Sequence, residues 1–272
     1  MNYDNWITSA QSKLTTSGLQ TARLDALLLL AFITSKSKAH LLAHGDSRLT
    51  DEEESNLSTL LDRRLNYEPI AYIIGVKEFY GRDFTVNKSV LVPRPESEDI
   101  ITLLLELPYP KHIIDVGTGS GALAITAKLE VPLANVCATD NDPACIEIAH
   151  QNAKSLHAEI TLIETDLLSA IDPMIINDSV ILANLPYVPM DYPINKDATH
   201  EPEAAIFSPE GGLMHYRRLF EQLDDTKQLP SAIICESLEK QHTELALLAQ
   251  EYGLNHAKTL GLQQLYMPSS KS

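Results

Sequence analysis

The sequence has few cysteines, no long apolar run and no basic leader at its N-terminus. Its cysteines, Cys137, Cys145 and Cys235, are spaced neither like a disulfide framework nor like a zinc site, which favours a reducing compartment. The longest apolar run, residues 26–33, has eight residues, whereas a membrane-spanning helix needs ~20. The first residues lack the positive flank of a signal peptide. We therefore expect a cytoplasmic protein with no membrane partner and no metal site.

Positive charge is also scarce. Lys and Arg number 21 against 37 Asp and Glu, which gives a formal net charge of −16. A surface this acidic repels phosphate backbones, so direct nucleic-acid binding is not expected unless a local basic patch exists. Acidity also keeps many proteins in solution, so the charge alone identifies no partner. The composition, 44% hydrophobic and 21% charged, is that of an ordinary folded chain.

The first 66 residues carry apolar side chains at helical spacing, for example at Leu57, Leu60 and Leu61. Thr50 followed three residues later by Glu53 is typical of a helix N-terminus. Residues 1–66 are therefore predicted to form a small helical bundle. Residues 67–98 change to short alternating runs, with a β-hairpin expected at 79–86 and a strand at 90–92. We interpret 67–98 as a β-hairpin connector that contributes to the site.

Residues 99–272 repeat the pattern of a strand, a turn and a helix. The pattern predicts strands at residues 112–116, 136–139, 160–163, 179–183 and 232–236. Alternating strands and helices indicate an α/β fold with a parallel sheet covered on both faces. Ligands of such sheets gather at the carboxyl ends of the strands. Polar residues and glycines lie at or just beyond the ends of four of these strands: Asp115 with Gly117 to Gly121, Asp140, Asp166 and Asn184. We expect them to form one site.

The first of these strands is followed by Gly117, Thr118, Gly119, Ser120 and Gly121. The spacing is G-x-G-x-G, whereas the dinucleotide fingerprint G-x-G-x-x-G has its third glycine one position later, so that fingerprint is not matched. No Lys-Ser/Thr follows, so a P-loop is excluded. Glycines at this turn would let the backbone approach a ligand closely.

Asp140 follows the next strand and is placed to accept hydrogen bonds from both ribose hydroxyls; alternatively it is a helix cap, a task that Asp142 could share. Asp166 could accept from an adenine amino group or be a solvated cap. A ligand with a ribose and an adenine but no phosphates suits this set, and S-adenosylmethionine is such a ligand.

The buried strand 179–183 is followed by Asn184, Leu185, Pro186 and Tyr187. The Asn184 side-chain oxygen and the Leu185 carbonyl can each accept one N–H, Pro186 fixes the turn, and the Tyr187 ring can pack on a flat face. The set could hold a planar NH2 group, of adenine or of glutamine alike, or could merely end a strand. Beside a methyl donor, holding both hydrogens would orient a poorly nucleophilic nitrogen for displacement.

The whole chain resembles the HemK/PrmC-type peptide chain release factor glutamine methyltransferases. The motifs that carry the resemblance, in the family's order, are residues 23–29, 68–81, 91–98, 115–121, 184–187, 201–205 and 211–218. The resemblance implies a Rossmann-like, seven-stranded class I methyltransferase domain over residues 99–272. It implies S-adenosylmethionine as cofactor and a class-1 release factor as partner, docked by residues 1–66, with the Gln of its Gly-Gly-Gln loop as substrate. We expect a monomer.

The resemblance also assigns residues. Asn184 and the Leu185 carbonyl would hold the Gln amide, with Pro186 and Tyr187 shaping its pocket. The cofactor would be surrounded by Asp115, Gly117, Thr118, Gly119, Ser120, Gly121, Asp140, Asp166, Leu167 and Asn184. Arg94, Glu96 and Glu201 would belong to the same cleft.

The chain departs from the family pattern at two places. Leu185 replaces the first Pro of Asn-Pro-Pro-Tyr, and Glu236-Ser-Leu replaces Glu-Ile-Gly near the C-terminus. The backbone carbonyl survives the first change, so the predicted chemistry does too. Two other functions stay open: an adenine N6 methyltransferase acting on ribosomal RNA, disfavoured by the acidic charge and by the position of the helical domain, and a degenerate S-adenosylmethionine-binding partner of the release factor.

Overall fold

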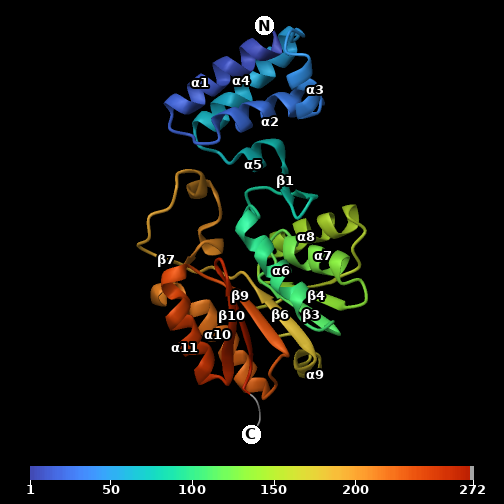
Figure 1. The fold of residues 1–272 in the computed structure, drawn as a ribbon, viewed down its shortest axis with the longest axis vertical. Coiled ribbons are helices and arrows are strands. Elements are labelled where there is room, and N and C mark those ends of the chain that lie inside the picture. Colours follow the sequence, from blue (N-terminus) through green and yellow to red (C-terminus); the bar gives the residue numbers. More distant parts are fainter. Residues whose placement is uncertain (270–272) are drawn as a thin grey trace. The chain divides into compact units, whose positions relative to one another are not determined.

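The computed structural model describes residues 1–269, which form two compact units (Figure 1). The first, which we call the helical unit, comprises Met1–Val76 and Ile194–His200. The second, the sheet unit, comprises Lys77–Pro193 and the chain from Glu201 onward. The chain therefore leaves the sheet unit after Pro193, contributes a short segment to the helical unit and returns at Glu201. No helix in residues 1–269 is long and apolar enough to cross a membrane.

The helical unit is a bundle of helices, as predicted for residues 1–66. Its helices are α1 (Tyr3–Thr16), α2 (Ala22–Thr34), α3 (Lys38–Ala43), α4 (Asp51–Leu65) and α5 (Ile70–Ile74). The start of α4 is the expected capping box: the Glu53 N–H donates to Thr50 Oγ1 (3.2 Å) and the Thr50 N–H to Glu53 Oε2 (2.8 Å). Fully buried leucines from three helices, Leu14, Leu30 and Leu57, lie in the core of the unit.

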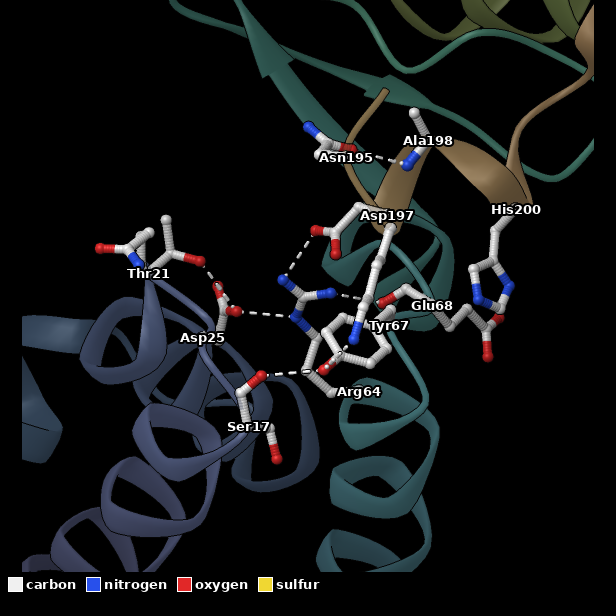
Figure 2. A network of polar contacts seen from close by, with 12 residues as sticks. Ser17, Thr21, Asp25, Arg64, Tyr67, Glu68, Asn195, Asp197, Ala198 and His200 are labelled. Carbon is white, nitrogen blue, oxygen red and sulfur yellow. Dashed lines mark hydrogen bonds and ion pairs between the residues drawn. The ribbon is translucent and has the colours of Figure 1, made fainter. Parts of the chain in front are cut away.

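A buried arginine ties the segment Ile194–His200 to the helices of the helical unit (Figure 2). The Arg64 Nε donates to Asp25 Oδ2 at 2.7 Å, and Nη2 donates to Asp197 Oδ2 at 2.8 Å. The third nitrogen, Nη1, donates to the Glu68 backbone carbonyl at 3.0 Å. Because the Arg64 side chain is only 3% exposed, these acceptors replace the water that the guanidinium loses on burial.

The sheet has seven strands within residues 1–269, as expected. Their order is β10-β11-β9-β6-β3-β4-β5. The strands are β3 (His112–Val116), β4 (Asn135–Asp140), β5 (Thr161–Glu164), β6 (Ser179–Ala183), β9 (Ala232–Glu236), β10 (Leu254–Leu260) and β11 (Gln263–Pro268). The pairs among β3, β4, β5, β6 and β9 are parallel, and β10 and β11 add an antiparallel edge. The predicted parallel α/β sheet is confirmed.

Helices cover both faces of the sheet (Figure 1). One face packs against α6 (Glu98–Glu106), α7 (Ala122–Glu130) and α8 (Pro143–Ser155), the other against α9 (Pro173–Asn177), α10 (Met214–Thr226) and α11 (His242–Glu251). Neighbouring strand residues alternate between the two faces: Ile113 belongs to the first core and Ile114 to the second. Both faces are apolar, which explains the continuous hydrophobic runs of the central strands.

The region after residue 67 differs in part from the prediction. The hairpin exists as β1 (Val76–Phe79) and β2 (Arg82–Thr85). The strand predicted at residues 90–92 is wrong: these residues form no strand. The Val92 N–H donates to the Glu201 carboxylate at 3.0 Å instead of to a neighbouring strand, and the following Pro93 has no N–H to donate.

Short elements that the pattern did not predict complete the fold. They are the parallel pair β7 (Val188–Pro189) and β8 (Phe207–Ser208), and the 3-10 turns η1 (Pro95–Ser97), η2 (Asp197–His200), η3 (Glu203–Ala205), η4 (Glu210–Gly212) and η5 (Glu239–Gln241).

Candidate functional site

A cleft of about 300 Å³ lies at the carboxyl ends of the parallel strands, within the sheet unit. Its wall includes Gly117 to Ser120 after β3, Asp140 at the end of β4, Asp166 with Leu167 after β5, and Asn184 to Pro186 after β6. The order of the sheet reverses at β3, which lies between β4 and β6, and such a switch point is where α/β sheets bind ligands. The structure thus brings together the glycine loop, Asp140, Asp166 and Asn184, which the sequence placed at the strand ends.

The glycines of the loop after β3 serve different purposes. All three have positive φ, +72° at Gly117, +54° at Gly119 and +81° at Gly121. A Cβ on Gly119 would meet nothing within 4 Å, so space is open beside this residue. A Cβ on Gly121 would lie 3.2 Å from the Ala149 Cα, so this glycine allows α7 and α8 to pack closely. Gly119 is therefore the position where a ligand can approach the backbone.

Asp115 lies beneath the loop and is not part of the cleft wall in the described structure. Its Oδ2 accepts from the Thr118 hydroxyl (2.6 Å) and from the Ala124 N–H (3.1 Å). Its Oδ1 is buried without a partner among the described residues, and burial raises the pKa of Asp115 to about 7. Asp115 holds the loop in shape from behind.

Asp140 and Asp142 divide the two tasks that the sequence left open. The Asp142 side chain caps α8 by accepting from the Ala144 N–H at 2.8 Å. The Asp140 side chain faces the cleft; its two oxygens accept from the N–H groups of Gly119 (2.8 Å) and Asp142 (3.0 Å). Burial raises the pKa of Asp140, and these backbone donors oppose that rise. Each oxygen keeps a lone pair for a ligand hydroxyl.

Asp166 has an ion-pair partner that the sequence analysis missed. Its carboxylate binds the Arg218 guanidinium, and both residues belong to the cleft wall. The Gln222 side chain accepts from the Leu168 N–H at 2.8 Å and so fixes the turn, in which Leu167 has φ +51°. Arg218 stood in a family motif, but no local pattern connects it with Asp166, which is 52 residues away.

The turn after β6 is held rigidly although Leu185 replaces a proline. The Tyr216 hydroxyl contacts the Ala183 carbonyl (3.1 Å) and the Glu236 backbone carbonyl. Gln241 Nε2 donates to the Tyr187 carbonyl at 2.7 Å. The Leu185 side chain is buried, and its Cδ2 would be 2.9 Å from a Cβ on Gly117. Packing of Leu185 against the glycine loop therefore restrains the turn.

The Asn184 amide has a defined direction. Its Nδ2 donates to the Ser97 hydroxyl at 2.8 Å, whereas within the described residues its Oδ1 accepts no hydrogen bond. The neighbouring Tyr187 donates its hydroxyl to Glu236 Oε1 at 2.9 Å, and in the described structure its ring is not part of the cleft wall. Asn184 thus keeps a free acceptor. Ser97, which belongs to the cleft wall, and Glu236, which does not belong to the described wall, contact Asn184 and Tyr187, respectively, and were not predicted as site residues.

The three residues expected at the cleft through the resemblance lie in different places. Arg94 belongs to the cleft wall and pairs with Glu201, with 2.6 Å between Nη2 and Oε1. Glu201 is buried behind it, where it also accepts from the Val92 N–H. Glu96 is exposed and outside the described cleft wall; its backbone carbonyl accepts from Gln263 Nε2. Glu201 therefore orients Arg94 from behind.

The charges of the cleft favour a ligand without phosphates. Among the lining residues that the structure describes, both cations, Arg94 and Arg218, are already paired with carboxylates. The described cleft wall therefore offers no unpaired Lys or Arg side chain, the groups that commonly bind phosphate. In residues 1–269 no group of three or more His, Cys, Asp or Glu side chains is placed to hold a metal ion. The three cysteines are unpaired; Cys145 and Cys235 are buried, and Cys137 is partly buried.

Comparisons with known proteins give one consistent result. Residues 5–75 match the model of the PrmC N-terminal domain, and residues 99–200 match that of the methyltransferase small domain. The release factor glutamine methyltransferase of Koribacter versatilis is 39% identical over 79% of this chain and 79% of the relative. The Escherichia coli protein of that name is 34% identical over 82% of this chain and 80% of the relative.

Solved methyltransferases share the fold. The catalytic domain of hMettl16 is 14% identical and covers 89% of this chain and 93% of its own, with a TM-score of 0.56. A methyltransferase from Pyrococcus furiosus is 17% identical and covers 78% of this chain and 99% of its own, with a TM-score of 0.52. At these identities the likeness concerns the fold alone.

Proposed function

The chain belongs to the release factor glutamine methyltransferases, and on this basis we propose that it transfers a methyl group from S-adenosylmethionine to a glutamine side chain. The acceptor is the amide nitrogen of the Gln in the Gly-Gly-Gln motif of a class-1 peptide chain release factor. Residues 1–66 dock this partner, residues 67–98 connect, and residues 99–272 carry the chemistry.

The donor set of the cleft fits S-adenosylmethionine. The Asp140 oxygens accept hydrogen bonds from the ribose hydroxyls, and Asp166 with Leu167 flanks the adenine. The space beside Gly119 takes the amino-acid chain of the ligand. Thr118, Ser120 and, from behind, Asp115 hold the loop that surrounds it. When bound, this cofactor supplies a methyl group activated by a sulfonium. The paired state of Arg94 and Arg218 agrees with a ligand that carries no phosphate.

The observation that carries the proposal is the direction of the Asn184 amide beside the cofactor cleft. With its NH2 group held by Ser97, Asn184 presents an oxygen acceptor, and the Leu185 carbonyl is the second. Two acceptors on the two hydrogens of a primary amide fix the rotation of the nitrogen and favour its pyramidal form. The chain thus contributes positioning and fixed dipoles rather than a strong base.

The net charge of −16 favours glutamine in a protein over adenine in ribosomal RNA as the substrate. An enzyme acting on ribosomal RNA meets a dense phosphate backbone and needs a basic face. The two arginines of the cleft are neutralised by Asp166 and Glu201, so they offer little attraction to phosphate.

Incubation with radiolabelled S-adenosylmethionine and either a release factor or ribosomal RNA tests the proposal. We expect label in the release factor and none in RNA. Label only in RNA would overturn the glutamine assignment. Cofactor binding measured by calorimetry, with no label in either substrate, would instead indicate a degenerate partner. A release factor whose motif Gln is replaced by Ala serves as the control for the site of transfer.

A further inference from the structure

Glu236 is a buried carboxylate that the proposed chemistry does not use. It ends β9, is 1% exposed and is not part of the described cleft wall. Two side chains donate hydrogen bonds to it, Tyr187 at Oε1 (2.9 Å) and Gln263 at Oε2 (2.9 Å), and the Ser97 hydroxyl is a third neighbouring donor, which opposes the rise of the Glu236 pKa on burial. Burying a carboxylate costs free energy unless hydrogen-bond donors satisfy it. The donors around Glu236 offset this cost, and the proposed chemistry gives no reason for the carboxylate to be there.

The chemistry of the partners sets the direction of the hydrogen bonds. The Gln263 Nε2 can only donate, and it does so to two oxygens, that of Glu236 and the Glu96 carbonyl (2.8 Å). An ionised carboxylate can only accept, and Asn184 already donates to the Ser97 oxygen at 2.8 Å, so the single proton of the Ser97 hydroxyl is available to Glu236. The Ser97 oxygen then offers a lone pair to its other neighbour, Asn184.

We propose that Glu236 is a positioning residue which, through Ser97, turns the Asn184 side-chain oxygen toward the substrate amide. This inference rests on the proposed function. An Asn amide can rotate by half a turn and exchange its oxygen for its nitrogen with little change of shape. With an acceptor at Ser97 the NH2 group is bound there, and the oxygen is left for the cleft. If Ser97 instead donated to Asn184, the reverse orientation would be favoured, and the Asn184 NH2 group would face the NH2 group of the substrate amide.

The negative charge has a second effect. Hydrogen bonds in a chain polarise one another, so the Glu236 carboxylate at one end makes the Asn184 side-chain oxygen at the other end a stronger acceptor. The cluster lies away from water because Glu236 and Ser97 are both buried. Burial raises the pKa of Glu236, and the three donors oppose that rise. The three donors favour the ionised form, which the direction of the chain requires.

The test is the near-isosteric change Glu236→Gln. Its NH2 group can donate to Ser97, which releases the Ser97 proton toward Asn184 and favours the wrong amide orientation. We expect kcat for release-factor methylation to fall about 10-fold or more. The affinity for S-adenosylmethionine should change less than about twofold, because no cofactor contact is altered. Glu130→Gln, which removes a half-buried carboxylate paired with Arg82 in the same unit, should leave kcat unchanged.

A second pair of variants decides the matter if Glu236→Gln does not fold. Ser97→Ala removes the relay and should lower kcat to a similar extent, whereas Ser97→Thr keeps the hydroxyl and should retain most of it. When all variants fold, Glu236→Gln with Ser97→Ala should cost no more than the larger single change, since both act through Asn184.

The outcomes separate this inference from the proposed function. Absence of methylation by the wild-type protein contradicts the proposed function itself. Methylation by the wild type together with an unchanged kcat of Glu236→Gln, or of Ser97→Ala, overturns the positioning of Asn184. A loss confined to thermal stability, with kcat and KM preserved, also overturns it, because a purely structural carboxylate would behave in this way.

Discussion

Replacement of Arg64 by Met tests the buried polar cluster of the helical unit. The change keeps much of the apolar stem and removes donors at 2.7 and 2.8 Å from the Asp25 and Asp197 carboxylates. The Asp25 side chain is 2% exposed and, among residues 1–269, would retain only the Thr21 hydroxyl as a donor, at 2.9 Å. Removing one partner of a buried pair typically costs ~3–5 kcal/mol, since the other charge stays buried. We expect a loss of this order in the free energy of unfolding.

Arg63→Met is the matched control. Arg63 is the preceding residue and is 40% exposed, and its partner Glu68 is also partly exposed. A solvent-screened pair of this kind contributes about 0–1 kcal/mol. The difference between the two variants therefore isolates burial, because the residue type, the helix and the substitution are the same.

Urea unfolding followed by tryptophan fluorescence measures the effect in the correct unit. The sequence contains one Trp, and Trp6 is buried in the core of the helical unit. Trypsin provides a second readout, since loss of the Asp197 contact should speed cleavage after Lys196. Equal midpoints for Arg64→Met and Arg63→Met, with no faster cleavage at Lys196, would refute the reasoning.

Two further predictions concern the glycine loop. Gly119→Ala should mainly weaken S-adenosylmethionine binding, measured by calorimetry. Gly121→Ala should mainly lower the melting temperature, since its Cβ would meet Ala149. The reverse result would contradict the assignment of Gly119 to ligand approach and of Gly121 to helix packing. The folded-state pKa of Asp115, about 7, exceeds the unfolded value of ~3.9, so its contribution to stability is greatest below pH ~4 and is lost as the pH rises through about 7. Asp115→Asn should flatten this part of the stability profile in urea titrations between about pH 4 and 7, and an unaltered slope would argue against the burial effect.

The sequence was most informative where a local pattern controls the structure. Residues 112–116 and 179–183 were predicted as strands with their observed bounds, because apolar runs followed by glycine or Asn mark buried strands and their ends. The gathering of Asp140, Asp166 and Asn184 followed from the geometry of parallel sheets and needed no further information.

Local pattern failed where distant residues compete for a backbone group. Residues 90–92 have strand-forming side chains, yet the Val92 N–H binds the Glu201 carboxylate, 109 residues away. The helix α5 contains three isoleucines, and it forms because Pro69 starts it and Gly75 ends it in the left-handed region. Tertiary context overrides β-propensity at residues 90–92, whereas at α5 the local start and stop residues override it.

The supporting residues of the site were hidden for the same reason. Ser97 binds Asn184 from 87 residues away, and Glu236 binds Tyr187 from 49 residues away. A serine before a helix is ordinarily a cap, but Ser97 makes no side-chain cap bond to α6. Its hydroxyl instead accepts from Asn184 at the candidate site, a contact that only the folded chain brings together.

Mass spectrometry of the Gly-Gly-Gln peptide from a methylated release factor tests the central claim most directly. The wild-type protein should add one methyl group to the Gln side chain. Asn184→Ala should lower the rate by about 100-fold, the usual cost of removing one positioned group that acts on the transition state. The exposed Asn177→Ala is the matched control and should keep the wild-type rate. A wild-type rate in Asn184→Ala, or a methyl group found on any residue other than that Gln, would contradict the account.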